Sequence, residues 1–176
     1  MPSLLLPNFT LLTPDGEDRP RRVCDHCAFI DYVNPKIVVG SVVVEAGQVL
    51  LCRRAIEPRL GFWTLPAGFL EEGETAEEGA LREAREEACA ELIVDGLLAV
   101  YSVPRISQIQ LMFRARLANS GFAPGPESLE VKFFAWADIP KEELAFPSVA
   151  WALAHYQDWQ NGAALPFSNP VGTIYR

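Results

Sequence analysis

The hydrophobic pattern of the chain predicts a mixed α/β protein. Residues 36–55, KIVVGSVVVEAGQVLLCRRA, contain two apolar, β-branched runs separated by Glu45-Ala46-Gly47. Runs of this kind on either side of a short break predict two strands joined by a hairpin. Glycine and proline are frequent in GFAPGPES, which predicts a loop there. Three further strands are predicted, at residues 91–103, 107–118 and 130–139.

Two segments are predicted to be helices. Residues 75–90 place four alanines and Leu81 on one arc, because successive helical residues are rotated by about 100°. Thr75, followed three residues later by Glu78, has the spacing of a capping box. A second helix is predicted from about Ser148 to Gln160. Strands on both sides of the first helix, and a helix near the end, indicate an α/β/α sandwich with a mixed sheet.

The two ends of the chain differ from the middle. Residues 1–35 are rich in proline, aspartate and arginine, and their TPDG turn predicts a strand pair in a small β-rich extension. Residues 36–160 are predicted to form the main domain, in which RLGFWTLPAGFLE is a loop. Residues 161–176 are predicted to be an irregular tail.

Composition and charge exclude some partners. The chain has 176 residues, 49% of them hydrophobic, and a net charge of −8. The size is sufficient for a hydrophobic core. The negative charge argues against a nucleic-acid partner, because affinity for a phosphate backbone comes mainly from Lys and Arg. No apolar run reaches membrane-spanning length, and MPSLLLPNF lacks the basic region of a signal peptide, so we expect a cytoplasmic protein without a membrane partner.

The first predicted helix carries an unusual acidic face. Glu83, Glu86 and Glu87 stand at i, i+3 and i+4 and project together beside the alanine arc. Like charges at this spacing destabilise a helix, and partial burial without a partner costs more. We therefore expect positive charge among them. Either nearby arginines supply it, for example Arg82 paired with Glu78, or a divalent cation with oxygen ligands does. An acidic helix with interspersed arginines is more often a solvated face with ion pairs.

The spacing around this helix resembles a known signature. Gly68 is followed after five residues by Glu74, and after seven more by REAREE. This resembles the Nudix hydrolase signature G-x5-E-x7-R-E-U-x-E-E-x-G-U, where U is apolar. Cys89 stands where the family has a glycine that ends the helix in a left-handed conformation. We expect this difference to affect the local helix end and not the chemistry.

Other segments resemble a bacterial and plant Nudix subgroup. They are CDHCAFIDYVNPKIVVG, RRAIEPRLGFWTLPAGFLE and PGPESLEVKFFAWADIP. Members of this subgroup carry an N-terminal segment similar to a zinc ribbon, and some hydrolyse ADP-ribose or FAD. The resemblance implies a Nudix fold and hydrolysis of a nucleoside diphosphate linked to another moiety, with Mg²⁺ or alternatively Mn²⁺. We expect ADP-ribose first, giving AMP and ribose 5-phosphate, or a dinucleotide such as FAD or NADH.

Two alternatives remain open. The substrate could be a nucleoside triphosphate or a capped nucleotide, because the signature addresses only the pyrophosphate and its metals. The protein could also be a non-catalytic ligand-binding regulator of the same fold. Such regulators tend to lose the signature carboxylates, all of which are present here.

The resemblance also implies roles for single residues. Arg82 and Glu74 would form an ion pair that holds the metal ligands in place. Gly68 would let its loop approach the helix without a Cβ clash. The implied metal ligands are the carboxylates of Glu83, Glu86 and Glu87 and the main-chain carbonyl of Ala67.

A general base and substrate contacts are expected outside the signature. Glu127 and Glu130 are the acidic pair in a suitable loop, and we prefer Glu130 because it adjoins a strand, although either could be an exposed loop acid. Arg53 or Arg54, at a strand end, is expected to contact the diphosphate. Stacking on a base is assigned to Phe62 and Trp63, although packing is the commoner role of such a pair. Pocket walls are assigned to Tyr101, Pro104 and Gln108.

The N-terminal cysteines form half of a zinc site. Cys24 and Cys27 have C-x2-C spacing, but a structural zinc needs four ligands and the chain has no second C-x2-C pair. His26 lies between the cysteines and is poorly placed to complete a tetrahedron, and His155 is the only other histidine. We expect a degenerate ribbon that has lost zinc and kept its strands. The alternative is that two half-sites pair across a homodimer, which the extension is expected to help form.

Overall fold

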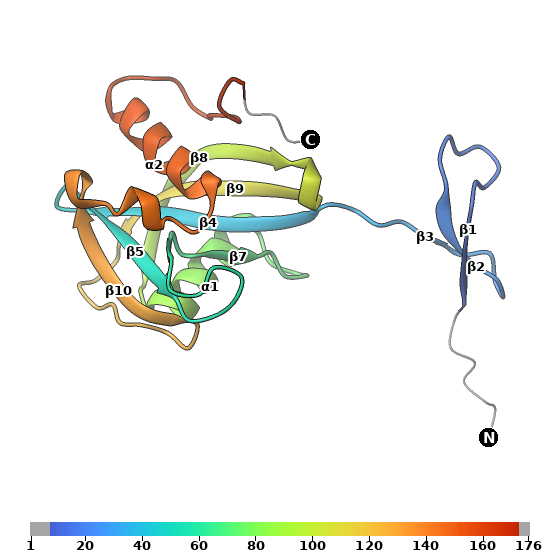
Figure 1. Ribbon diagram of the computed structural model, residues 1–176, viewed down its shortest axis with the longest axis horizontal. Helices are drawn as coiled ribbons and strands as arrows, with labels where there is room; N and C mark the ends of the chain where they lie inside the picture. Colours follow the sequence, from blue (N-terminus) through green and yellow to red (C-terminus); the bar gives the residue numbers. More distant parts are fainter. Residues whose placement is uncertain (1–7, 173–176) are drawn as a thin grey trace. The chain divides into compact units, whose positions relative to one another are not determined.

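The computed structural model describes residues 8–172 (Figure 1). The chain divides into two compact units, residues 1–35 and 36–176. None of the described helices is long and apolar enough to cross a membrane.

The N-terminal unit is a three-stranded antiparallel sheet. Its strands lie in the order β1 (Phe9–Leu12), β2 (Arg21–Cys24) and β3 (Ile30–Asp31). β1 and β2 flank the TPDG turn, so the predicted strand pair is confirmed. The only large side chains that this unit buries are Val23 and Cys24.

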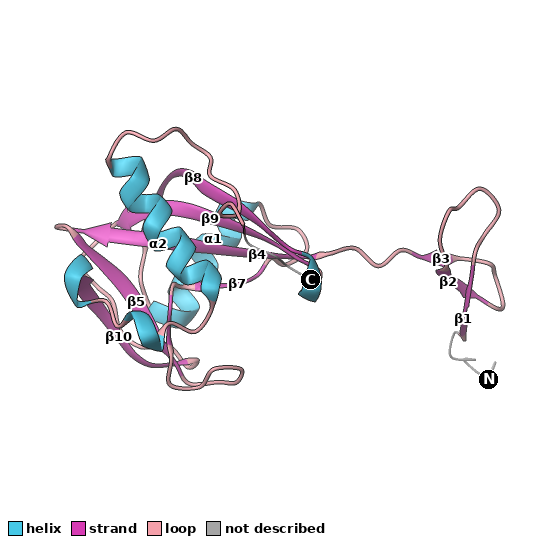
Figure 2. Cartoon of the chain, turned by 45° about the horizontal axis from the view of Figure 1, so that its top comes forward, coloured by secondary structure: helices cyan, strands magenta, loops and turns pink. Residues whose placement is uncertain are grey.

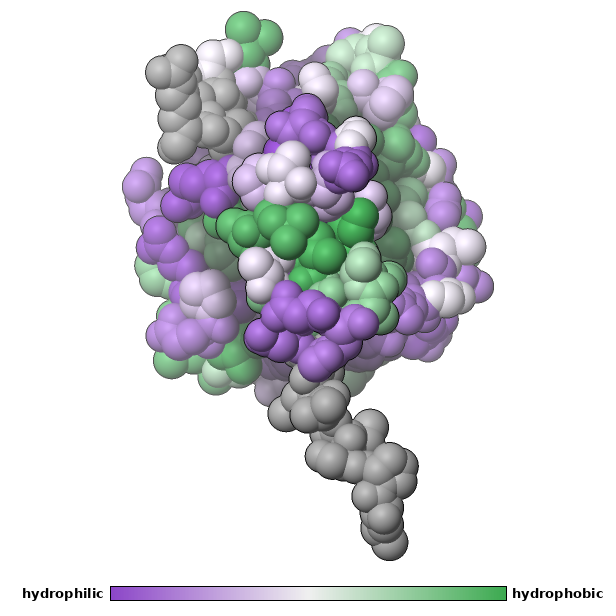
Figure 3. All heavy atoms as spheres, turned by 90° about the vertical axis from the view of Figure 1, so that its right-hand side faces the viewer, coloured by the Kyte–Doolittle hydropathy of each residue, from purple (hydrophilic) through white to green (hydrophobic). Residues whose placement is uncertain are grey.

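Several large apolar side chains of the N-terminal unit are exposed to solvent. A space-filling view shows apolar atoms gathered on the near face, with hydrophilic residues around them (Figure 3). Units of this size usually need a disulfide, a metal or a partner chain for stability. The structure contains one chain, so the homodimer stays a prediction. The exposed apolar residues are Leu11, Leu12, Phe29, Tyr32 and Val33.

The main unit is built on a mixed sheet (Figure 2). The strand order is β10-β5-β4-β9-β8, with β6 paired to β5 and β7 paired to β4. β4 and β9 are parallel, and the other pairs are antiparallel. The strands are β4 (Lys36–Glu45), β5 (Gln48–Arg54), β6 (Trp63–Thr64), β7 (Ala67–Phe69), β8 (Leu92–Val103), β9 (Gln108–Leu117) and β10 (Ser128–Ala135).

The predicted hairpin between β4 and β5 is confirmed. Its two connecting residues, Ala46 and Gly47, have φ values of 47° and 76°, as a two-residue hairpin turn requires. The segment RLGFWTLPAGFLE was predicted to be a loop, and this is wrong in part. It contains β6 and β7, which are too short to leave an alternating pattern in the sequence.

Two helices cover the sheet on opposite faces, α1 (Ala76–Ala88) and α2 (Pro147–Gln160) (Figure 1). Along β4, Val39 and Val43 pack in the clusters on the α1 side, whereas Val42 packs with α2. The predicted α/β/α sandwich is therefore confirmed. Short 3-10 turns lie at η1 (Pro104–Ile106), η2 (Trp136–Asp138) and η3 (Lys141–Glu143).

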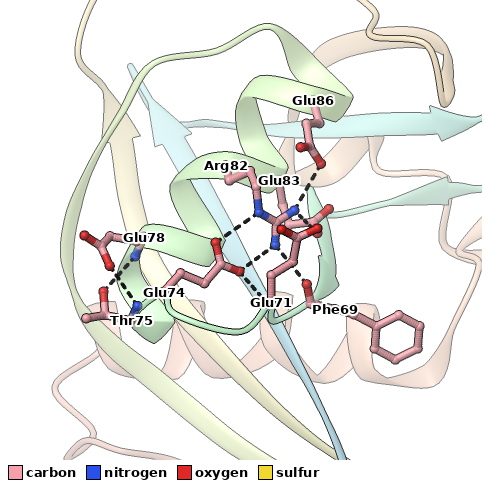
Figure 4. Close-up of polar contacts among 8 residues, drawn as sticks. All are labelled: Phe69, Glu71, Glu74, Thr75, Glu78, Arg82, Glu83 and Glu86. Carbon is pink, nitrogen blue, oxygen red and sulfur yellow. Dashed lines mark hydrogen bonds and ion pairs between the residues drawn. The ribbon is translucent and has the colours of Figure 1, made fainter.

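Both ends of α1 are fixed locally. The Thr75 hydroxyl accepts the N–H of Glu78, and the Glu78 carboxylate accepts the N–H of Thr75, so the predicted capping box is present (Figure 4). Cys89 ends the helix with φ 46° and ψ 32°, and its N–H donates to the carbonyl of Arg85. The cysteine thus keeps the left-handed conformation of the family glycine, at a steric cost of about 1–2 kcal/mol.

The described part of the C-terminal tail is irregular, as predicted, but it is attached to β8. The N–H of Phe167 donates to the carbonyl of Leu98, and its carbonyl accepts the N–H of Val100. The Asn169 side chain bonds both the N–H and the carbonyl of Ser102, each at 2.8 Å. The tail therefore occupies part of the outer edge of β8.

Candidate active site

Arg82 on α1 joins three carboxylates (Figure 4). Its Nε and Nη2 donate to Glu74 at 3.0 and 2.7 Å, and its Nη1 donates to Glu83 at 2.7 Å and to Glu86 at 3.0 Å. Nη2 also donates to the carbonyl of Phe69 in β7 at 2.9 Å. A planar guanidinium can make these contacts at once, which an ammonium cannot. The helix, the preceding loop and β7 are therefore held together at this point.

The pairing of Arg82 with Glu78, given as an example from the sequence, is wrong. The Glu78 carboxylate accepts the N–H of Thr75 at 2.8 Å and caps the helix. Arg82 turns instead to Glu74, one turn beyond the start of the helix. The local hydrogen bond at the cap thus takes precedence over an exposed i, i+4 ion pair, which contributes little.

Two acids of this helix are buried beneath the guanidinium. Glu83 and Glu87 are 8% and 7% exposed. Burial raises the pKa of Glu87 to about 8, although the N–H of Ala67, at 3.0 Å from Oε2, and the charge of Arg54 act in the opposite direction. Burial also raises the pKa of Glu83, against the effect of Arg82. Positive charge at this place is insufficient to stabilise both carboxylates as anions.

A divalent cation fits this set of donors. Mg²⁺ and Mn²⁺ prefer carboxylate and carbonyl oxygens, and a cation among buried carboxylates would supply the missing charge. Within residues 8–172, no three His, Cys, Asp or Glu side chains converge on one point as a finished metal site. The reason lies in the contacts above, since Arg82 holds Glu83 and Glu86, and the Ala67 N–H holds Glu87.

Gly68 makes the close approach of β7 and α1 sterically feasible. A Cβ atom at this position would collide with the carboxylate of Glu83. The glycine thus allows Ala67 and its neighbours to lie directly against the acids of the helix. This agrees with the role that the sequence pattern implies for Gly68.

The acids open into a cavity of about 850 Å³. A volume of this size is typical of small-molecule sites. One end is lined by the carboxylates of α1 together with Ala67, Gly68 and Glu127. The other end is mainly apolar, and it is lined by Val103, Ile106, Met112, Phe146 and Trp151.

The structure reverses the order of the two candidate bases. Glu127 lines the cavity, and its charge contributes to the raised pKa values of Glu83 and Glu87. Glu130 does not line it. Glu130 lies opposite Arg53 in the β10–β5 ladder, and its carboxylate approaches the Arg53 guanidinium to 4.0 Å. The preference for Glu130 is therefore corrected in favour of Glu127.

The two arginines at the end of β5 point to different places. Arg54 lines the cavity, with its Nε donating to the carbonyl of Pro58 at 2.8 Å and its guanidinium 5.3 Å from the centre of the Phe146 ring. Arg53 does not line the cavity, and its Nε donates to the carbonyl of Gly61 at 2.9 Å. Of this pair, only Arg54 is placed for contact with a ligand.

The aromatic pair assigned to base stacking lies outside the cavity lining. Trp63 is 6% exposed and packs edge to face against Phe134 in the core. Phe62 lies beneath the Arg59 guanidinium. Packing is thus the observed role of both. Among the assigned pocket walls, Gln108 lines the cavity, Tyr101 is fully buried, and Pro104 is replaced in the lining by its neighbours Val103 and Arg105.

Several lining residues were not identified from the sequence. Phe146 and Trp151 come from the start of α2, where no local pattern distinguishes a cavity wall from core. Gln110 and Met112 follow Gln108 at period 2 in β9, so the strand pattern could have assigned them to the same side. That signal was available once Gln108 had been chosen.

The N-terminal cysteines do not form a zinc site within one chain. Cys24 is buried and Cys27 is exposed, and the main-chain N–H groups of His26 and Cys27 lower the pKa of Cys24. Such a turn can supply two thiolates of the four ligands that structural zinc requires. In the described part of the chain no third ligand joins them. The predicted loss of zinc and its alternative, sharing between two copies, both remain predictions.

Comparison with known families gives two matches. The NUDIX domain family matches residues 34–153. A zinc-ribbon family described as Nudix N-terminal matches residues 8–33.

Individual relatives agree with these matches. The chain is 33% identical over 135 residues to an ADP-ribose pyrophosphatase of Methanocaldococcus jannaschii, covering 74% of this chain and 78% of that protein. It is 31% identical to an NAD-capped RNA hydrolase, NudC, of Edwardsiella ictaluri, covering 92% of this chain but only 52% of the relative. A crystal structure of a NUDIX hydrolase from Nitrosomonas europaea superposes with a TM-score of 0.87 at 42% identity, covering 94% of this chain and 96% of that one.

Proposed function

This chain belongs to the Nudix family of pyrophosphohydrolases, and on that premise we propose that it hydrolyses ADP-ribose to AMP and ribose 5-phosphate. The carrying observation is the cavity, which joins a buried carboxylate cluster at one end to apolar walls at the other. A diphosphate with an organic group on each side matches that arrangement. The similarity to an ADP-ribose pyrophosphatase supports this substrate.

The acid end is proposed to bind the diphosphate through metal. Enzymes of this family generally use a divalent cation, and here Glu83, Glu86, Glu87 and the carbonyl of Ala67 would hold Mg²⁺ or Mn²⁺. The bound cation would neutralise charge on the phosphate oxygens and lower the pKa of the attacking water. Arg82 and Glu74 keep the acids in position.

The reaction itself requires one water and one base. The water oxygen forms a bond to one phosphorus of the diphosphate, the bond from that phosphorus to the bridging oxygen breaks, and the bridging oxygen leaves with the other phosphate. Glu127 is proposed to accept the proton of the water, since it lines the cavity beside the buried acids. Arg54 is proposed to contact the diphosphate from the opposite wall.

A second candidate substrate is a dinucleotide of the NAD type. The similarity to NudC supports it, because this match covers 92% of the chain and extends into the N-terminal unit. Nucleoside triphosphates remain a weaker alternative, since they would place a third phosphate where the described walls are apolar. A purely ligand-sensing role is disfavoured by the complete set of signature carboxylates.

The proposal is tested with a substrate panel. The purified protein is incubated with Mg²⁺ and, separately, ADP-ribose, FAD, NADH, an NAD-capped oligonucleotide and nucleoside triphosphates, and products are identified by chromatography. Reaction in ¹⁸O-labelled water shows which phosphorus is attacked, because only one product gains the label. We expect AMP and ribose 5-phosphate from ADP-ribose at the highest kcat/KM. Cleavage of triphosphates alone, or of no compound, would contradict the proposal.

A further inference from the structure

We propose that Gln108 and Gln110 bind the hydrogen-bonding edge of the substrate nucleobase and select adenine. This inference rests on the proposed function and concerns the end of the cavity remote from the acids. Neither residue belongs to the signature, and only Gln108 was assigned to the pocket from the sequence.

The two amides act as one unit. Gln108 and Gln110 both line the cavity and are both partly buried, since they occupy alternate positions on the same side of β9. Gln110 Nε2 donates to Gln108 Oε1 at 3.2 Å. Among residues 8–172 no other side-chain contact of these amides is recorded, so Gln110 Oε1 can accept and Gln108 Nε2 can donate. If both amides were flipped, one acceptor and one donor would still remain.

The surroundings of the amides suit a flat, apolar ring. Met112 continues the same side of β9, Ile106 lies in the η1 turn before it, and Phe146 and Trp151 approach from α2. Flat aromatic ligands bury their faces against such side chains and present only their edges to polar groups. A nucleobase has this combination, whereas ribose phosphate is polar on all sides.

The strand register places the amides at a suitable distance from the acids. Gln110 is aligned with Val38 in β4, and Val38 is aligned with Phe69 in β7. In the next row but one, Met112 is aligned with Gly40 and then with Ala67. Two strand spacings therefore separate β9 from the Ala67 loop, or about 10 Å. A ribose between the base and the diphosphate fills this gap, and Val38 lines the cavity beneath it.

Adenine is the base that this pair complements. Its amino group donates beside a ring nitrogen that accepts, and Gln side chains pair with adenine in this way. Hypoxanthine has nearly the same shape but carries a carbonyl and an N–H at those positions, so the polarity of its edge is reversed. Comparison of the two bases therefore isolates hydrogen bonding from size and stacking.

The test measures kcat and KM for ADP-ribose and for inosine diphosphate ribose. The proteins are the wild type, Gln108→Met, Gln110→Met, the double variant and Gln160→Met, a control at an exposed position outside the cavity. We expect the wild type to prefer ADP-ribose by about tenfold or more in kcat/KM. The preference should appear in KM with kcat nearly unchanged, because the base lies away from the reacting phosphorus. In the double variant it should fall close to onefold, and the control should keep it.

A binding measurement separates this inference from the proposed function. AMP and IMP are titrated into each variant by calorimetry, which needs no turnover, and thermal melting confirms that the variants fold. Tighter binding of AMP than of IMP, lost in the double variant, supports the inference even if no diphosphate is cleaved. Equal affinity for AMP and IMP in the wild type, or full discrimination in the double variant, overturns it even if ADP-ribose is a good substrate.

Discussion

The two ends of the cavity are held in place by different forces. At the acid end, four carboxylates and one guanidinium from residues 74–87 are fixed by short charged hydrogen bonds. At the other end, apolar side chains from β8, η1, β9 and α2 are fixed by packing. Charged contacts impose one geometry, whereas apolar walls tolerate change. The first end is therefore suited to one reaction on a diphosphate, and the second to the choice among diphosphate substrates.

The largest effect is expected from removing charge at the acid end. The double change Glu86→Gln, Glu87→Gln should lower kcat/KM by about 10³-fold or more, because it removes two proposed ligands of the cation while keeping side-chain size. The measurement is steady-state hydrolysis of the preferred substrate across a Mg²⁺ titration. Glu77→Gln, an exposed acid on the same helix, is the matched control and should behave as wild type. Wild-type turnover in the double variant would refute the metal assignment.

A smaller effect is expected from changing the residue that positions the acids. Arg82→Lys keeps the charge but cannot contact Glu74, Glu83, Glu86 and the Phe69 carbonyl together, so kcat/KM should fall by about 10–100-fold. The Mg²⁺ concentration for half-maximal rate should rise. Arg85→Lys, at an exposed pair with Glu91, is the control. An unchanged Mg²⁺ dependence in Arg82→Lys would show that the guanidinium has no part in positioning the acids.

The boundary between the two ends should respond by only a few fold. Phe146→Leu removes the ring beside Arg54, and we expect KM to rise about three- to fivefold with little change in kcat, because cation–π contacts at partly exposed sites are weak. Phe146→Tyr keeps the ring and should restore wild-type KM. A fall in kcat in both variants would mean that Phe146 acts on the reaction and not through Arg54.

The smallest effect concerns the support of the apolar end. His155 bonds the Tyr101 hydroxyl at 2.8 Å and stacks on Phe167, and Tyr101 packs against the cavity residue Trp151. Burial lowers the pKa of His155, against the charge of Asp158. The folded state thus binds this proton less well than the unfolded state, whose histidine pKa is about 6.5.

The sign of the resulting pH effect follows directly. The stabilisation by neutral His155 should be complete above about pH 6.5 and should be lost as the pH falls towards the lower pKa of the folded protein. Melting temperatures between pH 7.5 and 5.5 measure it, with His155→Gln as a non-titrating control. A wild-type curve parallel to that of His155→Gln would contradict the assignment, and kcat at pH 7.5 should differ little between them.

The same contrast explains what the sequence could predict. The acids of α1, the capping box and the β4–β5 hairpin depend on residues close together in the chain, so their spacing was sufficient. The choice between Glu127 and Glu130 was not accessible, because it depends on a register shift at the start of β10 that places Glu130 opposite Arg53. The apolar end was also inaccessible, since Phe146, Met112 and Ile106 become neighbours only through the sheet and its crossing helix.

The C-terminal tail has a consequence beyond the cavity. β8 is the last strand of the sheet, and unpaired main-chain groups on such a strand can recruit strands from other molecules. Phe167 and Asn169 already occupy the groups of Leu98, Val100 and Ser102. These few irregular residues thus serve as a built-in guard against aggregation, and a chain shortened before Phe167 would offer its sheet to the first β-strand it met.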